Sequence, residues 1–240
     1  MRNQITLGQV AVDAKSNQIT AIPKLLQAID ISGALVTIDA MGCQTEIATT
    51  IIQRQAEYCL PVKRNQTTFY QEIKLYFETH LESDLVNRPV RRFETIERGH
   101  AREENRYYFI CPVPDHFLSR SRWPQRKAIG MAMSDKIRDG KQINDVRDYI
   151  IKRYMAARKF AETVRSHWGI ENSLHWQLDV TFKEDQSRVR LGHAEAHFCI
   201  LHRAASSMLK NETMANVDIK NKRLQAGWDD QYLEKVLFGT

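Results

Sequence analysis

One short segment late in the chain, residues 167–176, gathers side chains that could do chemistry. His167, Glu171 and His175 are four residues apart, so a helix would place them on one face. Trp168 lies one turn before Glu171. Because an unpaired carboxylate is costly to bury beside bulky apolar groups, Glu171 is expected to be neutralised, paired or bound to a metal ion. It is the first candidate functional residue of the chain.

A second acidic candidate, Asp39, lies far upstream at the end of a short apolar run, residues 34–38. The run is rich in β-branched residues, as a buried parallel strand is. Ligands of open α/β sheets bind beyond the carboxyl ends of such strands, so Asp39 stands where a site residue is expected. The competing interpretation is an ordinary turn or cap aspartate, which is the commoner role for a lone Asp.

The elements around Asp39 alternate between strand and helix. Strands are expected over 7–12, 34–38 and 58–62, and helices over 22–29, 46–55 and 67–81. Such alternation predicts a parallel sheet with helices on its faces. The pattern then changes: strands are expected over 91–96, 107–112 and 128–133, Asp139–Gly140 is typical of a hairpin turn, and helices follow over 156–176 and 194–209.

Composition and cysteine usage narrow the class of protein. The 240 residues are 42% hydrophobic and 27% charged, which is ordinary for a globular protein. No apolar run approaches the ~20 residues that cross a bilayer, and no signal peptide is visible, so we expect a cytoplasmic protein that does not span a membrane. The four cysteines form no CxxC pair, which argues against a zinc knuckle and a disulfide framework.

The charge distribution favours a nucleic-acid partner. The formal net charge is +6, and basic residues form three clusters between the two acidic candidates. The clusters are Arg88, Arg91 and Arg92; Arg120, Arg122, Arg126 and Lys127; and Lys152, Arg153, Arg158 and Lys159. A single cluster is as often a solvated face. The middle cluster surrounds Trp123, a residue type that can stack on bases, so these five side chains are candidate DNA contacts.

Two motifs resemble the insertion-sequence transposases of the ISAs1 group, also called H-repeat-associated proteins. They are Val-Thr-Ile-Asp-Ala-Met-Gly-Cys-Gln at 36–44 and His-Trp-Gly-Ile-Glu-Asn at 167–172. Segments 15–23 and 174–182 extend the likeness, which covers roughly residues 7–210. The resemblance implies a DDE transposase that cleaves and transfers DNA strands. Its implied partners are the insertion-sequence ends and target DNA, its location is the nucleoid when DNA is bound, and a homodimer is allowed.

The resemblance also assigns the chemistry. Asp39 matches the family's second acid and Glu171 its third, which implies catalytic and metal-binding roles for both. Mg²⁺ or Mn²⁺ is the expected cofactor because these hard ions prefer carboxylate oxygens. In related transposases an arginine lies one turn before the glutamate. This chain has His167 there, which makes His167 a further candidate DNA contact.

One departure concerns the family's first aspartate, which lies on the first strand of the core in a Val-Asp-Gly-Lys-like motif. Asp13 superficially resembles that motif, but it directly precedes residues 15–17 and so takes a later, non-catalytic position. We therefore expect a truncated, catalytically impaired copy that lacks the first two strands and the first acid. The expected fold class is α/β, a truncated RNase H-like core with a β-rich insertion before the C-terminal catalytic helix. The expected parts are a partial core at 1–86, the insertion at 87–150, core helices carrying Glu171 at 151–210, and a tail at 211–240.

Two alternatives come from other classes of protein. His167, Glu171 and His175 could hold Zn²⁺ in a hydrolase, although no HExxH signature is present. The chain could instead be a non-catalytic DNA-binding or interfering fragment. The preferred metal ion separates the first alternative from a transposase, and a nuclease assay separates the second.

Overall fold

The computed structural model describes residues 5–10, 12, 18–81, 89–99, 102–118, 122–123, 125–138, 141–170, 174–189 and 191–239. The chain divides into two compact units, one formed by residues 12–167 and the other by residues 1–11 together with 168–240. In the described part of the chain, no helix combines the length and the apolar character needed to cross a membrane.

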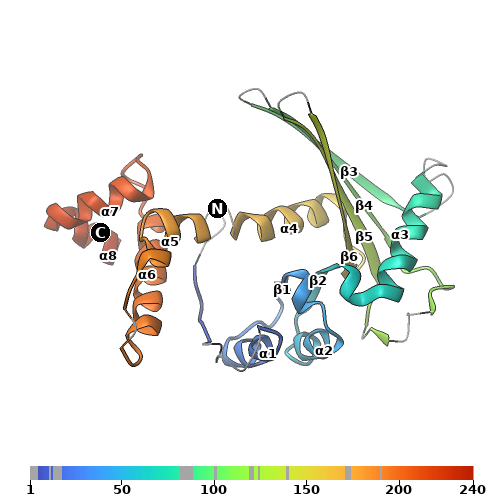
Figure 1. The fold of residues 1–240 in the computed structure, drawn as a ribbon, viewed down its shortest axis with the longest axis horizontal. Coiled ribbons are helices and arrows are strands. Elements are labelled where there is room, and N and C mark those ends of the chain that lie inside the picture. Colours follow the sequence, from blue (N-terminus) through green and yellow to red (C-terminus); the bar gives the residue numbers. More distant parts are fainter. Residues whose placement is uncertain are drawn as a thin grey trace. The chain divides into compact units, whose positions relative to one another are not determined.

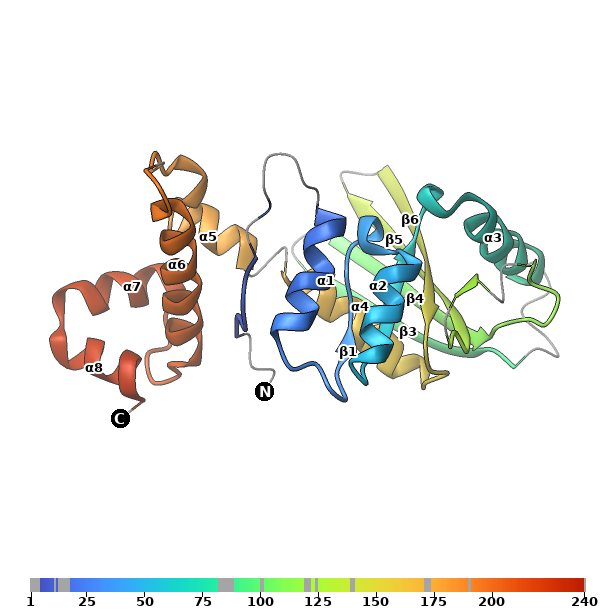
Figure 2. The same cartoon turned by 90° about the horizontal axis from the view of Figure 1, so that it is seen from below.

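The larger unit is a mixed α/β structure built on one curved sheet (Figures 1 and 2). Its strands are β1 (Leu35–Val36), β2 (Glu57–Val62), β3 (Arg91–Gly99), β4 (Arg102–Pro112), β5 (Ala128–Arg138) and β6 (Lys141–Ile151), in the order β1-β2-β6-β5-β4-β3. Its helices are α1 (Gln18–Ala28), α2 (Thr45–Gln53), α3 (Thr67–Leu81) and α4 (Ala157–Ile170), with short 3₁₀ turns η1 (Ala40–Gly42) and η2 (Arg64–Gln66). The predicted α/β class is thus confirmed.

The strand directions follow the two patterns of the sequence. β1 and β2 are parallel, as predicted for the part that alternates between strand and helix, and every other neighbouring pair is antiparallel. The β-rich segment continues the same sheet, because β6 pairs directly with β2. The strand predicted over 7–12 was wrong, since residues 7–10 have no regular structure. Asp139–Gly140 lies outside the described residues, while the strands that flank it pair with Arg138 opposite Lys141.

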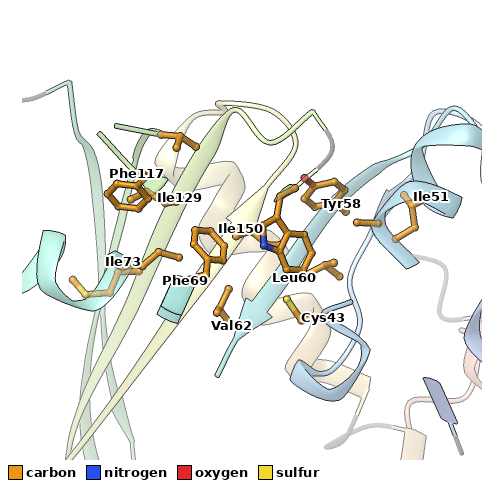
Figure 3. Close-up of a cluster of buried hydrophobic side chains, with 14 of the residues drawn as sticks. Cys43, Ile51, Tyr58, Leu60, Val62, Phe69, Ile73, Phe117, Ile129 and Ile150 are labelled. Carbon is orange, nitrogen blue, oxygen red and sulfur yellow. The ribbon is translucent and has the colours of Figure 1, made fainter. Parts of the chain in front are cut away.

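The main hydrophobic core lies between one face of the sheet and helices α1, α2 and α3. Side chains in a strand point alternately to opposite faces, so every second residue of β2 enters this core: Tyr58, Leu60 and Val62 are all at most 2% exposed. Ile51 of α2 and Ile73 of α3 pack into the same cluster. Figure 3 shows part of it, with side chains from β2, α2 and α3 gathered around the sheet.

Helix α4 covers the opposite face, away from α1 and α2 (Figures 1 and 2). Its Phe160 is fully buried. The Phe160 ring lies edge-on to Tyr108 of β4, with 6.2 Å between ring centroids, and to Tyr149 of β6, with 5.3 Å between ring centroids. Between these strands, Gly130 of β5 leaves the space that the ring fills. A Cβ at residue 130 would lie 2.7 Å from the Phe160 ring and 3.1 Å from Ile151. The bare backbone of Gly130 therefore sets how closely α4 approaches the sheet.

The smaller unit is helical. Its helices are α5 (Trp176–Val180), α6 (Ala194–Asn211), α7 (Ile219–Trp228) and α8 (Asp230–Phe238), with a 3₁₀ turn η5 (Glu184–Gln186). Buried Glu212 joins three of them: it follows α6, receives a hydrogen bond from Tyr232 of α8 at 2.7 Å, and pairs with Lys222 of α7 at 3.1 Å. Burial alone would raise the pKa of Glu212, but these bonds and two backbone N–H donors lower it to about 2. The segment expected to be a tail therefore forms two packed helices.

The first prediction concerns the seat of α4. Gly130→Ala should lower the free energy of unfolding by about 1–3 kcal/mol, because the added methyl group would force the Phe160 ring to move from its contacts with two tyrosines. Urea unfolding measures the change. Gly169→Ala in the last turn of α4, where an added Cβ meets nothing within 4 Å, is the control. It should be neutral or stabilising by up to about 1 kcal/mol. Equal stabilities of the two variants would contradict this account.

The second prediction concerns Asp148 of β6, which is 4% exposed and faces α3. Its Oδ1 has no hydrogen-bond partner among the described residues. Burial, with a smaller contribution from Glu78, raises the pKa of Asp148 from 3.8 to about 7, and Lys74 opposes the shift. Between these two pH values the folded state binds more protons than the unfolded state, so stability should fall as pH rises.

Asp148→Asn has no carboxyl group that can ionise at this position, so the fall in stability with rising pH should disappear. Its free energy of unfolding should exceed that of the parent chain by an amount that grows from pH 5 to pH 8, reaching the order of a few kcal/mol. Urea unfolding at four pH values measures it. Asp145→Asn removes a more exposed carboxylate of the same strand and serves as the control. Parallel pH curves for Asp148→Asn and the parent chain would refute the prediction.

Candidate active site

Asp39 lies at the turn that follows β1. The strand hydrogen bonds end at Val36, and the backbone reverses after Asp39 as Gly42 N–H donates to the Asp39 carbonyl at 2.8 Å. A Cβ at Gly42 would lie 2.4 Å from Ile38 Cγ2, so the turn folds tightly onto the residue before Asp39. The Asp39 side chain remains 68% exposed.

The period of an extended chain decides which side chains accompany Asp39. Residues two apart point to the same face, so Thr37 and Asp39 share one face while Ile38 points to the other. Ile38 packs against the main core. Thr37 and Asp39 are therefore directed to the α4 side of the sheet.

His167 of α4 contacts both of these residues. Its Nε2 lies 3.1 Å from Asp39 Oδ1, and its Nδ1 lies 3.2 Å from Thr37 Oγ1. A carboxylate can only accept, so Nε2–H is the donor in the first bond. The imidazole is 22% exposed and thus lies deeper than the carboxylate that it holds.

Three contacts hold α4 on the sheet so that its last turn lies beside Asp39. Phe160 anchors the middle of the helix against Gly130, and the guanidinium of Arg158 lies 5.5 Å from the ring centroid of Phe93. Near the helix end, Arg165 forms an ion pair with Glu97 of β3 at 2.8 Å. The helix is thus fixed to β3, β4, β5 and β6 before it reaches Asp39.

Two predicted site residues fall outside the described part of the chain. Glu171 is one of them, so its meeting with Asp39 stays a prediction, and Arg120 is the other. Asp13, the superficial match to the first acid, also lies outside it. His167 is described, and it contacts the side chain of Asp39.

The candidate DNA-contact cluster divides into buried and exposed residues. Trp123 is 2% exposed and packs on Phe69, with 6.0 Å between ring centroids. Arg126 is 7% exposed, and its guanidinium lies 4.2 Å from the centroid of the same ring. This burial leaves little of either side chain for contact with a ligand. Arg122 and Lys127 are exposed and remain candidates.

Most described residues of the other two basic clusters hold partners within the protein. Arg91 stacks over Tyr154 at 4.1 Å, and Arg92 pairs with Glu94 at 3.1 Å. In the third cluster, Lys152 Nζ donates to the Ala56 carbonyl at 3.0 Å, and Arg153 pairs with Glu57 at 3.2 Å. Their sequence clustering therefore reflects structural contacts at least as much as a binding surface.

Asp39 fits one ligand position of a divalent cation, because its carboxylate is exposed and offers hard oxygen donors. His167 does not fit the alternative zinc site well, since both of its nitrogens are engaged by Thr37 and Asp39. Within the described residues, no group of three or more His, Cys, Asp or Glu side chains is arranged to hold a metal ion. Sequence reasoning missed Thr37, although its place two residues before Asp39 is the signal that identifies it.

A mixed α/β fold, with an exposed aspartate at the end of a parallel strand and a returning helix beside it, is consistent with the RNase H-like domains of DDE transposases. Residues 1–209 match the family described as Transposase DDE domain, and the chain belongs to that family. The DDE transposase family expected from the sequence is thereby confirmed.

Curated relatives support the same assignment. The chain is 35% identical to the "H repeat-associated putative transposase YhhI" of Escherichia coli K12, over 99% of this chain and 64% of that protein. It is 38% identical to the "Putative transposase YncI" of Escherichia coli O157:H7, over 98% of this chain and 60% of that protein. The chain thus spans just under two thirds of the length of these relatives. The DDE class generally uses divalent metal ions and binds DNA.

Proposed function

We propose that this chain takes part in the metal-dependent cleavage and transfer of DNA strands during the transposition of an insertion sequence of the ISAs1 group. Asp39 and Glu171 would hold Mg²⁺ or Mn²⁺. When bound, such ions activate the attacking oxygen and stabilise the leaving oxygen of the scissile phosphate. The observation that carries the proposal is the contact between His167 and Asp39 in a chain of the DDE family.

The proposal is supported by the position of Glu171 in the sequence relative to His167. His167 lies in the last turn of α4, with its imidazole 3.1 Å from the Asp39 carboxylate. Glu171 follows His167 by four residues, the separation at which two side chains share a helix face. The proposal therefore brings together two acids of the family motif that lie in distant parts of the sequence.

The DNA partners proposed are the insertion-sequence ends and the target duplex. Arg120, Arg122 and Lys127 would contact phosphates, since Arg122 and Lys127 are exposed and Arg120 is their sequence neighbour. The proposal also includes the four parts 1–86, 87–150, 151–210 and 211–240, a homodimer, and association with the nucleoid when DNA is bound. The second candidate function, DNA binding without catalysis, is an outcome of the tests below.

The third prediction tests the metal site directly. The 240-residue chain should bind Mn²⁺ in an electron paramagnetic resonance titration. Asp39→Asn and Glu171→Gln should each weaken binding by about tenfold or more, or about 1.4 kcal/mol, because each removes a charged oxygen ligand. Binding is measured because the chain spans only part of the length of its relatives.

Glu46→Gln is the matched control, since Glu46 is an exposed carboxylate in the first turn of α2. Its affinity for Mn²⁺ should equal that of the parent chain. Unchanged affinity in both Asp39→Asn and Glu171→Gln would reject the metal site, and DNA binding by the same samples would then favour the non-catalytic function.

The fourth prediction concerns DNA affinity. A triple variant with Arg120, Arg122 and Lys127 changed to Gln should bind a duplex more weakly. The slope of log K against log salt should fall in magnitude by up to about three, because each lost phosphate contact removes roughly 0.9 of slope. Fluorescence anisotropy over about 50–200 mM salt measures this slope.

A variant with the exposed Lys24, Lys220 and Lys235 changed to Gln controls for net charge and should keep the parent slope. Arg126 is left intact, because its guanidinium packs on Phe69 and its removal would damage the core. A triple variant with the parent slope would assign these charges to a solvated face.

A further inference from the structure

We propose that His167 is a positioning residue that holds the Asp39 carboxylate in one orientation for the metal ion. The inference rests on the proposed function, which makes Asp39 a metal ligand. It gives His167 a task different from the DNA contact predicted from sequence. The imidazole acts through the carboxylate and does not itself touch the ion.

The first argument is that Asp39 needs an external restraint. Its side chain is 68% exposed, and the turn that it begins uses its backbone carbonyl rather than its carboxylate. An exposed aspartate with no other contact would distribute among several staggered rotamers. The bond from His167 Nε2 selects those in which Oδ1 lies 3.1 Å from the ring.

The second argument is that the ring of His167 is itself restrained at two points. Its Nδ1 is fixed at 3.2 Å by the Thr37 hydroxyl, which can donate or accept as the ring requires. Its backbone belongs to α4, which Phe160 and the Arg165–Glu97 ion pair attach to the sheet. The donor offered to Asp39 therefore has a defined position, and it remains a donor in either protonation state of the imidazole, because the carboxylate only accepts.

The third argument is that the bond leaves capacity for an ion. A carboxylate has two oxygens and about four lone-pair sites, of which the His167 bond takes one. Metal-ligating carboxylates are commonly held by such outer hydrogen bonds, and removing the outer partner typically weakens metal binding about 10- to 100-fold. His167 and Thr37 together supply this outer support from α4 and from the end of β1.

The test compares two amide variants that differ in reach. His167→Gln places an amide N–H near the position of Nε2, whereas His167→Asn places it near Nδ1 and cannot reach Asp39 from the same backbone. His167→Asn should lower the affinity for Mn²⁺ about 10- to 100-fold. His167→Gln should recover most of that loss. Thr37→Val, which removes the bond to Nδ1 at nearly constant volume, should give a smaller loss.

Folding is checked by circular dichroism and urea unfolding of the same samples, and equal stability of the Gln and Asn variants makes their comparison a measure of reach alone. A second readout needs no metal: in ¹⁵N-labelled protein, the His167 Nε2–H signal should be slow to exchange with water and become fast in Asp39→Ala. The proposed function fails if Asp39→Asn binds Mn²⁺ as the parent does. The positioning role fails if Asp39→Asn is impaired while His167→Asn binds normally, or if His167→Gln is no better than His167→Asn.

Discussion

The contact between Phe160 and the backbone of Gly130 is the constraint on which the geometry of the larger unit depends. A helix can lie flat on a sheet only where side chains make room, and here one glycine among the tyrosines of neighbouring strands makes it. The contact of Phe160 with Gly130 fixes the middle of α4 on the sheet, and the ion pair of Arg165 with Glu97 fixes the part of the helix near its C-terminal end. The imidazole of His167 then lies within hydrogen-bond distance of Thr37 and Asp39.

Local patterns were enough to predict the elements near the site. The β-branched run before Asp39 and the helix over 67–81 both depend on residues close in sequence. The pairing of β2 with β6 could not be predicted in this way, because its register joins Cys59 to Ile151 across the whole β-rich segment. The burial of Arg126 and Trp123 could not be predicted for the same reason. Both side chains pack on Phe69, which lies on a helix distant in the sequence, and a cluster of charges in the sequence does not reveal that contact. The helices after residue 211 did leave signals, since Asp218 and Asp229 cap α7 and α8, but the polar composition of α7 obscured them.

Two buried acids of the sheet show how differently the fold treats charge. Glu104 of β4 is 3% exposed, yet Arg106 and Lys136 pair with it at 2.7 and 3.3 Å, and Ser134 donates to it at 3.0 Å. Burial raises the pKa of Glu104, but these partners outweigh burial and lower it. Asp148 is similarly buried, its Oδ1 has no hydrogen-bond partner among the described residues, and its pKa rises to about 7. Charge is therefore tolerated inside this sheet where the same strand and its neighbour supply partners, and neutralised where they do not.

The separation of Asp39 and His167 in the sequence has a consequence for the order in which the protein is made. The two residues are 128 positions apart, and β6, whose pairing completes the central part of the sheet, also lies between them. At ribosomal rates of about 5–20 residues per second, Asp39 leaves the ribosome roughly 6–25 s before the helix that will hold it. During that interval the nascent chain has the carboxylate but neither the finished sheet nor the imidazole. Assembly of the site is therefore a late event in folding, and a chain interrupted before α4 carries Asp39 with no partner to position it.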